Sequence, residues 1–261
     1  MQVIALSRSE DLVASGHLDD HADRAIVMCN RFQVIWPRGC MAVETIPMWI
    51  PQGVMHEGAE ATVTAGSWLG KPAVLKARRP RGYRHPDLDR RLTRQRLTAE
   101  VRILGRLHGL GFPAPSLMDV DQGAAWILMS KIEGRPLYDS LKDGTSDVES
   151  LERLGSIIRS LHEAGVSHGD LTTHNVIVSE DGQLHLIDFG LARQSPELEH
   201  LGLDLQVLNE CLTASHSVVG GAVDAVVRGY LEGDNAPPDV EPANQVIERF
   251  QKITGRVRYH G

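Results

Sequence analysis

Several side chains that can bind metal and phosphate lie close together in the second half of the sequence. His168, Asp170 and Asn175 follow the pattern H-x-D-x-x-x-x-N, and Asp188 opens the triplet Asp-Phe-Gly. Asn175 and Asp188 supply hard oxygen ligands of the kind that Mg²⁺ prefers, and Asp170 can accept a proton from an attacking hydroxyl or water. Phosphoryl transfer depends mainly on positioning and charge neutralisation, so this order and spacing predict an enzyme that uses ATP and Mg²⁺.

A lysine upstream of this constellation is placed to hold the phosphates. Lys76 ends the apolar run 73–76, as the phosphate-binding lysine of kinases ends a strand. Glu100 lies among apolar residues of a predicted helix, and we expect it to form an ion pair with Lys76 that directs the ammonium to the α- and β-phosphates. Lys76, Glu100 and Asp170 are therefore the predicted catalytic residues, and Asn175 and Asp188 are the predicted metal ligands.

Two further segments are predicted to contact the nucleotide. The first precedes Lys76 at the distance expected of a loop that covers the phosphates, and it consists of Gly58, Ala59 and Glu60. The second follows an apolar strand and would form the hinge between two lobes, where the backbone groups of Ser130 and Ile132 are expected to hydrogen-bond adenine. Its predicted nucleotide-binding residues are Met129, Ser130 and Ile132.

The hydrophobic pattern indicates the elements that must position these residues. We expect short strands before residue 50, strands over 53–78, a helix over 87–110, strands over 116–120 and 124–129, a helix over 148–164, a hairpin from 175–178 and 184–187, and helices after 201. The stretch 66–72 imitates a phosphate-binding loop but has one residue too few and ends in proline, so it is predicted to be a turn between strands. The order of elements predicts an α+β, bilobal, protein-kinase-like fold, with an extension over 1–52, a small β-rich lobe over 53–132 and a helical lobe over 133–261.

The segment after the Asp-Phe-Gly triplet departs from that of regulated kinases. Gly169 occupies the position of the arginine that contacts a phosphorylated activation loop. Asp204 follows Asp188 by only 16 positions, with no Ala-Pro-Glu sequence between them. Asp204 is predicted to start a helix and to hold the catalytic loop. We therefore expect a minimal activation segment without a phosphorylation switch or a docking shelf for peptides.

Composition and charge exclude several classes of protein. Among 261 residues, 42% are hydrophobic and 23% charged, as in an ordinary globular protein, and the net charge of −7 argues against a surface that coats nucleic acid. Three scattered cysteines do not suggest a disulfide framework or a zinc ribbon. The sequence shows neither a signal peptide nor an apolar run long enough to span a membrane, so the expected location is the cytoplasm. The segment 76–106 is strongly basic. Two roles remain open for it, a solvated helix face or a contact for a phosphate-rich partner such as tRNA.

These motifs, taken together, resemble one family of atypical kinases. The stretch 76–100, with its Tyr-Arg-His-Pro insertion at 83–86, and the stretches 168–173 and 187–192 are similar to the PRPK-like, RIO-related kinase subunit of the KEOPS complex. The resemblance implies kinase and ATPase activity, the site roles given above, and partnership with a tRNA threonylcarbamoyladenosine synthase subunit and other KEOPS-like subunits. His174 stands where the family generally has a smaller residue, the basic C-terminal tail is thinned, and residues 1–50 have no counterpart.

Two alternatives remain open at this point. The first is a phosphotransferase acting on a sugar, an aminoglycoside or a lipopolysaccharide core, because such enzymes share the H-x-D-x-x-x-x-N pattern. However, only about 60 residues follow Leu201, which leaves little room for an acceptor-binding insertion. The second alternative is a nucleotide-binding scaffold without catalysis, against which the intact Lys76, Asp170, Asn175 and Asp188 argue.

Overall fold

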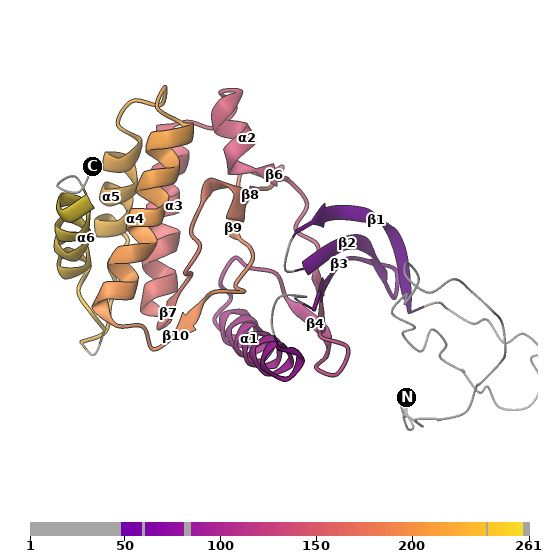
Figure 1. Cartoon of the computed structure of the whole chain (residues 1–261). Helices are drawn as coiled ribbons and strands as arrows, with labels where there is room; N and C mark the ends of the chain where they lie inside the picture. The colour runs from indigo at the N-terminus through magenta and orange to yellow at the C-terminus, as the bar shows by residue number, and fades with distance from the viewer. Residues whose placement is uncertain (1–47, 59–60, 81–84, 239, 258–261) are drawn as a thin grey trace, which may run out of the picture.

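The computed structural model describes residues 48–58, 61–80, 85–238 and 240–257, over which a sheet is followed by a group of helices (Figure 1). The strands expected before residue 48 and the predicted nucleotide contacts Ala59 and Glu60 lie outside these residues. Within the described ranges, no helix combines the length and the apolar character needed to cross a bilayer.

Five antiparallel strands form the first sheet, in the spatial order β1-β2-β3-β5-β4. They are β1 (Trp49–Glu57), β2 (Ala61–Trp68), β3 (Lys71–Arg78), β4 (Leu117–Asp121) and β5 (Trp126–Ser130). The imitation phosphate loop is a turn between β2 and β3, as predicted. Strand β1 starts at Trp49, ahead of the boundary expected at residue 53, because Trp49 is buried and pairs with Trp68. The division of the chain into an extension and two lobes stays a prediction.

Alternation along β3 sorts its side chains onto two faces of the sheet. Leu75 joins a small core on one face, whose buried members are Trp49, Ala73, Leu75, Trp126 and Leu128. Lys76 follows Leu75 and therefore lies on the opposite face. There it pairs across the strands with Ile127, which belongs to the main core of the protein. The lysine thus emerges on the face of the sheet that the rest of the chain covers.

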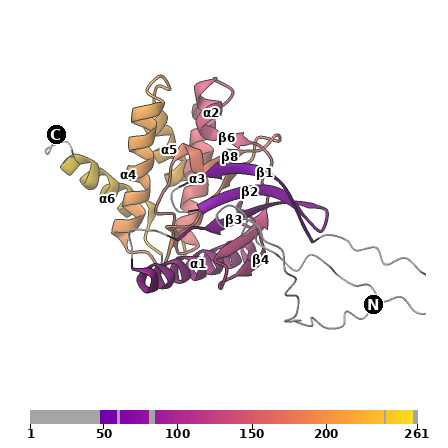
Figure 2. The same ribbon diagram turned by 45° about the vertical axis from the view of Figure 1, so that its right-hand side comes forward.

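Helix α1 (Pro86–Gly109) contacts strands β4 and β5 and also the helical part of the chain (Figures 1 and 2). Pro86 occupies its first turn, where a missing N–H is harmless. The apolar side of the helix is buried in the main core through Leu97, Ile103, Leu104 and Leu107. Because these residues share a core with the later helices, α1 is packed against both halves of the molecule.

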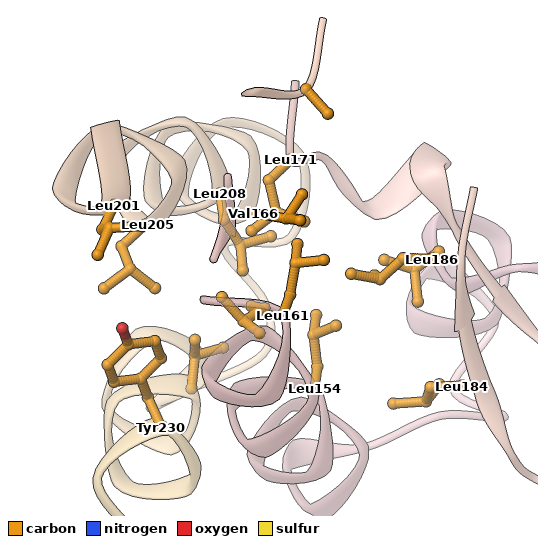
Figure 3. Packing of buried hydrophobic residues seen from close by; sticks show 14 of the residues in the cluster. Leu154, Leu161, Val166, Leu171, Leu184, Leu186, Leu201, Leu205, Leu208 and Tyr230 are labelled. Carbon is orange, nitrogen blue, oxygen red and sulfur yellow. The ribbon is translucent and has the colours of Figure 1, made fainter. Parts of the chain in front are cut away.

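The remaining elements surround a small hairpin. The longer helices are α3 (Val148–Glu163), α4 (Leu198–Ser215), α5 (Ala222–Glu232) and α6 (Ala243–Val257). The hairpin strands are β8 (Val176–Val178) and β9 (Leu184–Leu186), preceded by the 3-10 turn η1 (Thr173–Asn175). The short elements are β6 (Arg135–Pro136), α2 (Leu137–Lys142), β7 (Val166–Ser167) and β10 (Arg193–Gln194), none of which is long enough to show a sequence period. Figure 3 shows side chains of α3, α4, α5 and the hairpin converging in one core.

Candidate active site

The β8–β9 hairpin brings the two predicted metal ligands to one place. Val176 pairs with Leu186 across the hairpin. The N–H of Ile187 then donates to the carbonyl of Asn175 at 3.0 Å. Asn175 is therefore directly opposite the residue that precedes Asp188, although thirteen positions separate the two in the sequence.

Lys76 joins this group from the sheet. Its Nζ lies 2.8 Å from Oε1 of Glu100 on α1 and 2.6 Å from Oδ1 of Asp188. The side chains of Lys76 and Glu100 are 10% and 1% exposed, whereas that of Asp188 is 48% exposed. The ion pair expected between Lys76 and Glu100 is thus present, and it is linked to the Asp-Phe-Gly triplet through the same ammonium.

The charges of this cluster stabilise one another. Burial lowers the pKa of Lys76, but the attraction of the Glu100 and Asp188 carboxylates outweighs it, so the pKa is raised above its ordinary value. Burial raises the pKa of Asp188, but Lys76 and the Gly190 N–H outweigh it and the pKa is lowered. Asp188 also has a φ of 62°, a left-handed conformation that aspartate tolerates better than most residues. Such a conformation is kept where the position of the side chain matters.

Asp170 and Asn175 lie in direct contact. The Asn175 Nδ2 donates to the Asp170 carbonyl at 2.8 Å and to its Oδ2 at 3.2 Å. This orientation leaves the Asn175 Oδ1 for another ligand. In Asp188, Oδ1 accepts from Lys76 and Gly190, and Oδ2 has no hydrogen bond to the described residues. One amide oxygen and one carboxylate oxygen suit Mg²⁺, which takes one or two protein ligands and completes its shell with phosphate and water.

A buried aspartate on α4 holds the start of the catalytic loop. Asp204 accepts from the backbone N–H groups of His168 at 2.6 Å and Gly169 at 2.7 Å. The predicted contact is therefore present. However, the predicted position at a helix start is wrong, because α4 begins at Leu198 and Asp204 lies within it. His162 of α3 reaches the same carboxylate at 3.2 Å and the hydroxyl of Tyr230 at 2.8 Å.

His168 is a structural member of the loop. Its Nδ1 accepts from the N–H of Asp170 at 3.3 Å, so the ring proton is on Nε2, which donates to the Ile187 carbonyl at 3.0 Å. Burial lowers the pKa of His168, which favours the neutral ring. Its two hydrogen bonds connect the catalytic loop to the residue before Asp188.

The chain after the Asp-Phe-Gly triplet is short and fixed by backbone hydrogen bonds. β10 pairs with β7, and the Ser195 N–H donates to the Gly165 carbonyl at 2.9 Å. Gly169 has a φ of 78°, and a Cβ added to it would lie 2.4 Å from the carbonyl oxygen of Leu191. The closeness of this segment therefore explains why glycine stands where regulated kinases have arginine.

The predicted adenine contacts are refined by the strand pairing. Met129 pairs with Val74 inside the sheet. The N–H of Ser130 is already bound to the carbonyl of Ser116 at 2.9 Å, so only its carbonyl remains for the base. The Ile132 N–H has no acceptor among the described residues. This carbonyl and the nearby N–H are the acceptor and donor that the adenine edge would require.

Of the predicted covering loop, Gly58 lies within the described residues. The N–H of Gly58 donates to the carbonyl of Ala61 at 2.9 Å and closes the β1–β2 connection. Arg78 and His162 were not predicted as site residues. Arg78 gave no signal because it sits in a run of basic residues, and His162 is an isolated histidine near the end of an amphipathic helix.

Comparisons with known proteins found relatives of this chain. The RIO domain family matches residues 75–213. The EKC/KEOPS complex subunit BUD32 of Coccidioides immitis is 32% identical over an alignment that covers 80% of this chain and 91% of that protein. The probable bifunctional tRNA threonylcarbamoyladenosine biosynthesis protein of Methanothermobacter thermautotrophicus is 35% identical over 80% of this chain, which spans 37% of that longer relative.

A solved structure has a more distant likeness. The Rio2 kinase-ADP/Mg²⁺-phosphoaspartate complex from Chaetomium thermophilum aligns with a TM-score of 0.49 and 15% identity, over 81% of this chain and 73% of that one. The family assignment rests on the sequence matches alone. They favour the atypical kinases over the small-molecule phosphotransferases, and the chain belongs to the RIO-domain family, with the KEOPS subunit BUD32 among its relatives.

Proposed function

We propose that this chain is an ATP-dependent kinase and ATPase that transfers the γ-phosphoryl group to a protein hydroxyl or to water. The observation that carries the proposal is the placement of Lys76 between Glu100 and Asp188, next to a catalytic loop that presents Asp170 and Asn175. This is the set of groups that phosphoryl transfer requires.

Each residue would have a distinct task in that reaction. Lys76, held by Glu100, binds the α- and β-phosphates of the substrate. Asn175 and Asp188 would hold Mg²⁺, which neutralises charge on the phosphates when bound. The oxygen of the attacking hydroxyl or water bonds to the γ-phosphorus while the bond from that phosphorus to the ADP oxygen breaks. Asp170 accepts the proton that the attacking group loses. The Ser130 carbonyl and the Ile132 N–H hold adenine, and the loop at Gly58, Ala59 and Glu60 covers the phosphates.

The biological setting is proposed from the relatives. One is named a subunit of the EKC/KEOPS complex, and another is named a bifunctional protein of tRNA threonylcarbamoyladenosine biosynthesis, of which this chain matches only one part. We infer that the chain supports the same modification in the cytoplasm, with a tRNA threonylcarbamoyladenosine synthase subunit and other KEOPS-like subunits as partners. The fixed, short activation segment supports a role in which hydrolysis serves an assembly.

The test is ADP formation from Mg-ATP under single-turnover conditions, which reports transfer to water and to a protein hydroxyl alike, with the chain alone and with a synthase partner. We expect turnover in the wild type and a loss of about a hundredfold or more in Asp170→Asn and Asp188→Ala, because each removes a group that acts in the transition state. Absence of turnover in both conditions would refute the proposal. Turnover unaffected by Asp170→Asn would instead point to a contaminating ATPase.

A further inference from the structure

Strand β3 carries a second buried cation beside Lys76. Arg78 lies two positions further along the strand, so both side chains lie on the same face of the sheet. The side chain of Arg78 is only 6% exposed, and its Nη2 lies 2.5 Å from Oε2 of Glu100. A Cβ added to Gly190 would lie 3.3 Å from this Nη2 and 3.3 Å from the Lys76 Nζ. The two cations therefore meet at the Asp-Phe-Gly triplet.

The two oxygens of Glu100 are divided between these cations. Oε1 accepts from Lys76 and Oε2 from Arg78. An arginine commonly binds a carboxylate with two parallel N–H bonds, which would occupy both oxygens. Here the Nε of Arg78 is buried without a hydrogen-bond partner among the described residues. The end-on contact leaves one oxygen of Glu100 for the lysine.

The charge balance of the cluster depends on this second cation. Lys76 and Arg78 are matched by Glu100 and Asp188, so the four groups together are neutral. If Asp188 engages a divalent cation, the other three retain one positive charge. Without Arg78, only Lys76 and Glu100 would remain, and this pair carries no net charge because Lys76 alone balances the buried Glu100.

We propose that Arg78 is a positioning residue that neutralises Glu100 through Oε2, so that Lys76 presents a net positive charge to the phosphates of the nucleotide. The inference rests on the proposed function, since it assumes that the site binds a nucleoside triphosphate. It assigns to Arg78 a role that acts through Glu100 and Lys76, with no direct contact to the substrate.

The test compares the binding of ATP and of adenosine by calorimetry in the presence of Mg²⁺, with a non-hydrolysable analogue in place of ATP, for the wild type, Arg78→Met and Arg78→Lys. Adenosine reports on the base site alone, because it lacks phosphates. Arg78→Met should weaken ATP binding about tenfold, as expected for the loss of a buried charge that acts on a phosphate site, and should leave adenosine binding unchanged. Arg78→Lys, which keeps the charge, should restore part of the ATP affinity.

A matched control is available at a remote ion pair of the same chemistry. Arg228 of α5 binds Glu152 at 3.0 Å, with its side chain 53% exposed. Arg228→Met should bind both ligands like the wild type. An equal loss of affinity for ATP and for adenosine in Arg78→Met would show a general structural role and overturn the proposal. An affinity for ATP equal to that of the wild type would overturn it as well.

A double-mutant cycle tests the route of the effect. If Arg78 acts through Glu100, then Arg78→Met should weaken ATP binding much less in a Glu100→Gln background, where no charge needs balancing. Full additivity of the two substitutions would contradict the inference. Failure of the wild type to bind ATP would instead refute the proposed function itself, so the two outcomes are distinguishable.

Discussion

The carboxylate of Asp204 shows how a single residue positions the catalytic chemistry. It accepts hydrogen bonds from two consecutive backbone N–H groups and from the ring of His162. Only 2% of the surface of Asp204 is exposed. Three donors offset the desolvation of a charge that would otherwise be costly to bury. The loop that carries Asp170 is therefore anchored from beneath by α4.

Asp204 should make stability depend on acid. Burial raises its pKa, but the hydrogen bonds from His162 and the Gly169 N–H outweigh it and lower the pKa below the ordinary 3.8. A lowered pKa stabilises the fold at pH values above about 4, and this contribution is lost as the pH falls toward the folded-state pKa. Asp204→Asn should therefore be less stable by about 2 kcal/mol at neutral pH but lose less of its stability on acidification. Urea unfolding across a pH series checks this, and parallel curves for the two proteins would contradict it.

Gly169 gives a second prediction at the residue scale. Gly169→Ala should lower the free energy of unfolding by about 3 kcal/mol, because a left-handed backbone and a collision with the Leu191 carbonyl both oppose a side chain. Gly182, with a φ of 79° and open space around it, is the matched control. Gly182→Ala should cost only about 1 kcal/mol, the backbone contribution. Equal losses in denaturant unfolding would show that the contact with Leu191 is unimportant.

Among the elements, α1 connects the nucleotide site to the helical part of the protein. Glu100 points from it to Lys76, and Arg106 near its end donates from Nε to the carbonyl of Ala164 at 2.5 Å. Ala164 is the C-cap of α3, where a cation also offsets the helix dipole. Together with the shared core, this contact keeps Glu100 beside Lys76 in the structure.

Removal of this connection should weaken the fold and the site together. We expect Arg106→Met to lower the free energy of unfolding by about 1–2 kcal/mol, because it leaves a helix end without its charged donor. Thermal unfolding measures the effect, and Arg102→Met, an exposed position on the same helix, should leave the melting temperature unchanged. Similar melting temperatures for the two variants would contradict the role assigned to Arg106.

Some of the elements and site contacts could be predicted from the sequence and others could not. The long helices over 86–109 and 148–163 and the hairpin over 176–186 were predicted well, because each has a clear hydrophobic period or turn. Lys76, Glu100, Asn175 and Asp188 were expected to cooperate, and the structure brings them together. Arg78 was missed because a sequence cannot show which cations of a basic run are buried, and the placement of Asp204 within α4 depended on where that helix begins.

At the scale of the whole molecule, the basic segment 76–106 separates into two sets of cations. Lys76, Arg78 and Arg106 are engaged within the fold, whereas Arg91 and Arg94 are exposed on one face of α1. The whole chain has a net charge of −7, so this basic face contrasts with an acidic remainder of the sequence. If the segment contacts tRNA, the exposed set must be responsible.

Reversal of these exposed charges tests the tRNA contact. Arg91→Glu/Arg94→Glu should weaken tRNA binding and lower the salt dependence of log K by about one per lost phosphate contact. Arg228→Glu/Lys252→Glu changes the net charge equally on α5 and α6 and is the control. Identical salt slopes for both double variants would show that α1 is a solvated face and does not contact tRNA.

The most direct measurement of the central claim is the effect of Mg²⁺ on ATP affinity in the wild type and in Asp188→Ala. If Lys76, Asn175 and Asp188 together bind one metal-bound triphosphate, Mg²⁺ should increase the affinity of the wild type for ATP about tenfold or more. In the variant, Mg²⁺ should have little effect on this affinity, and adenosine should bind both proteins equally. An unchanged Mg²⁺ effect in Asp188→Ala would contradict the account.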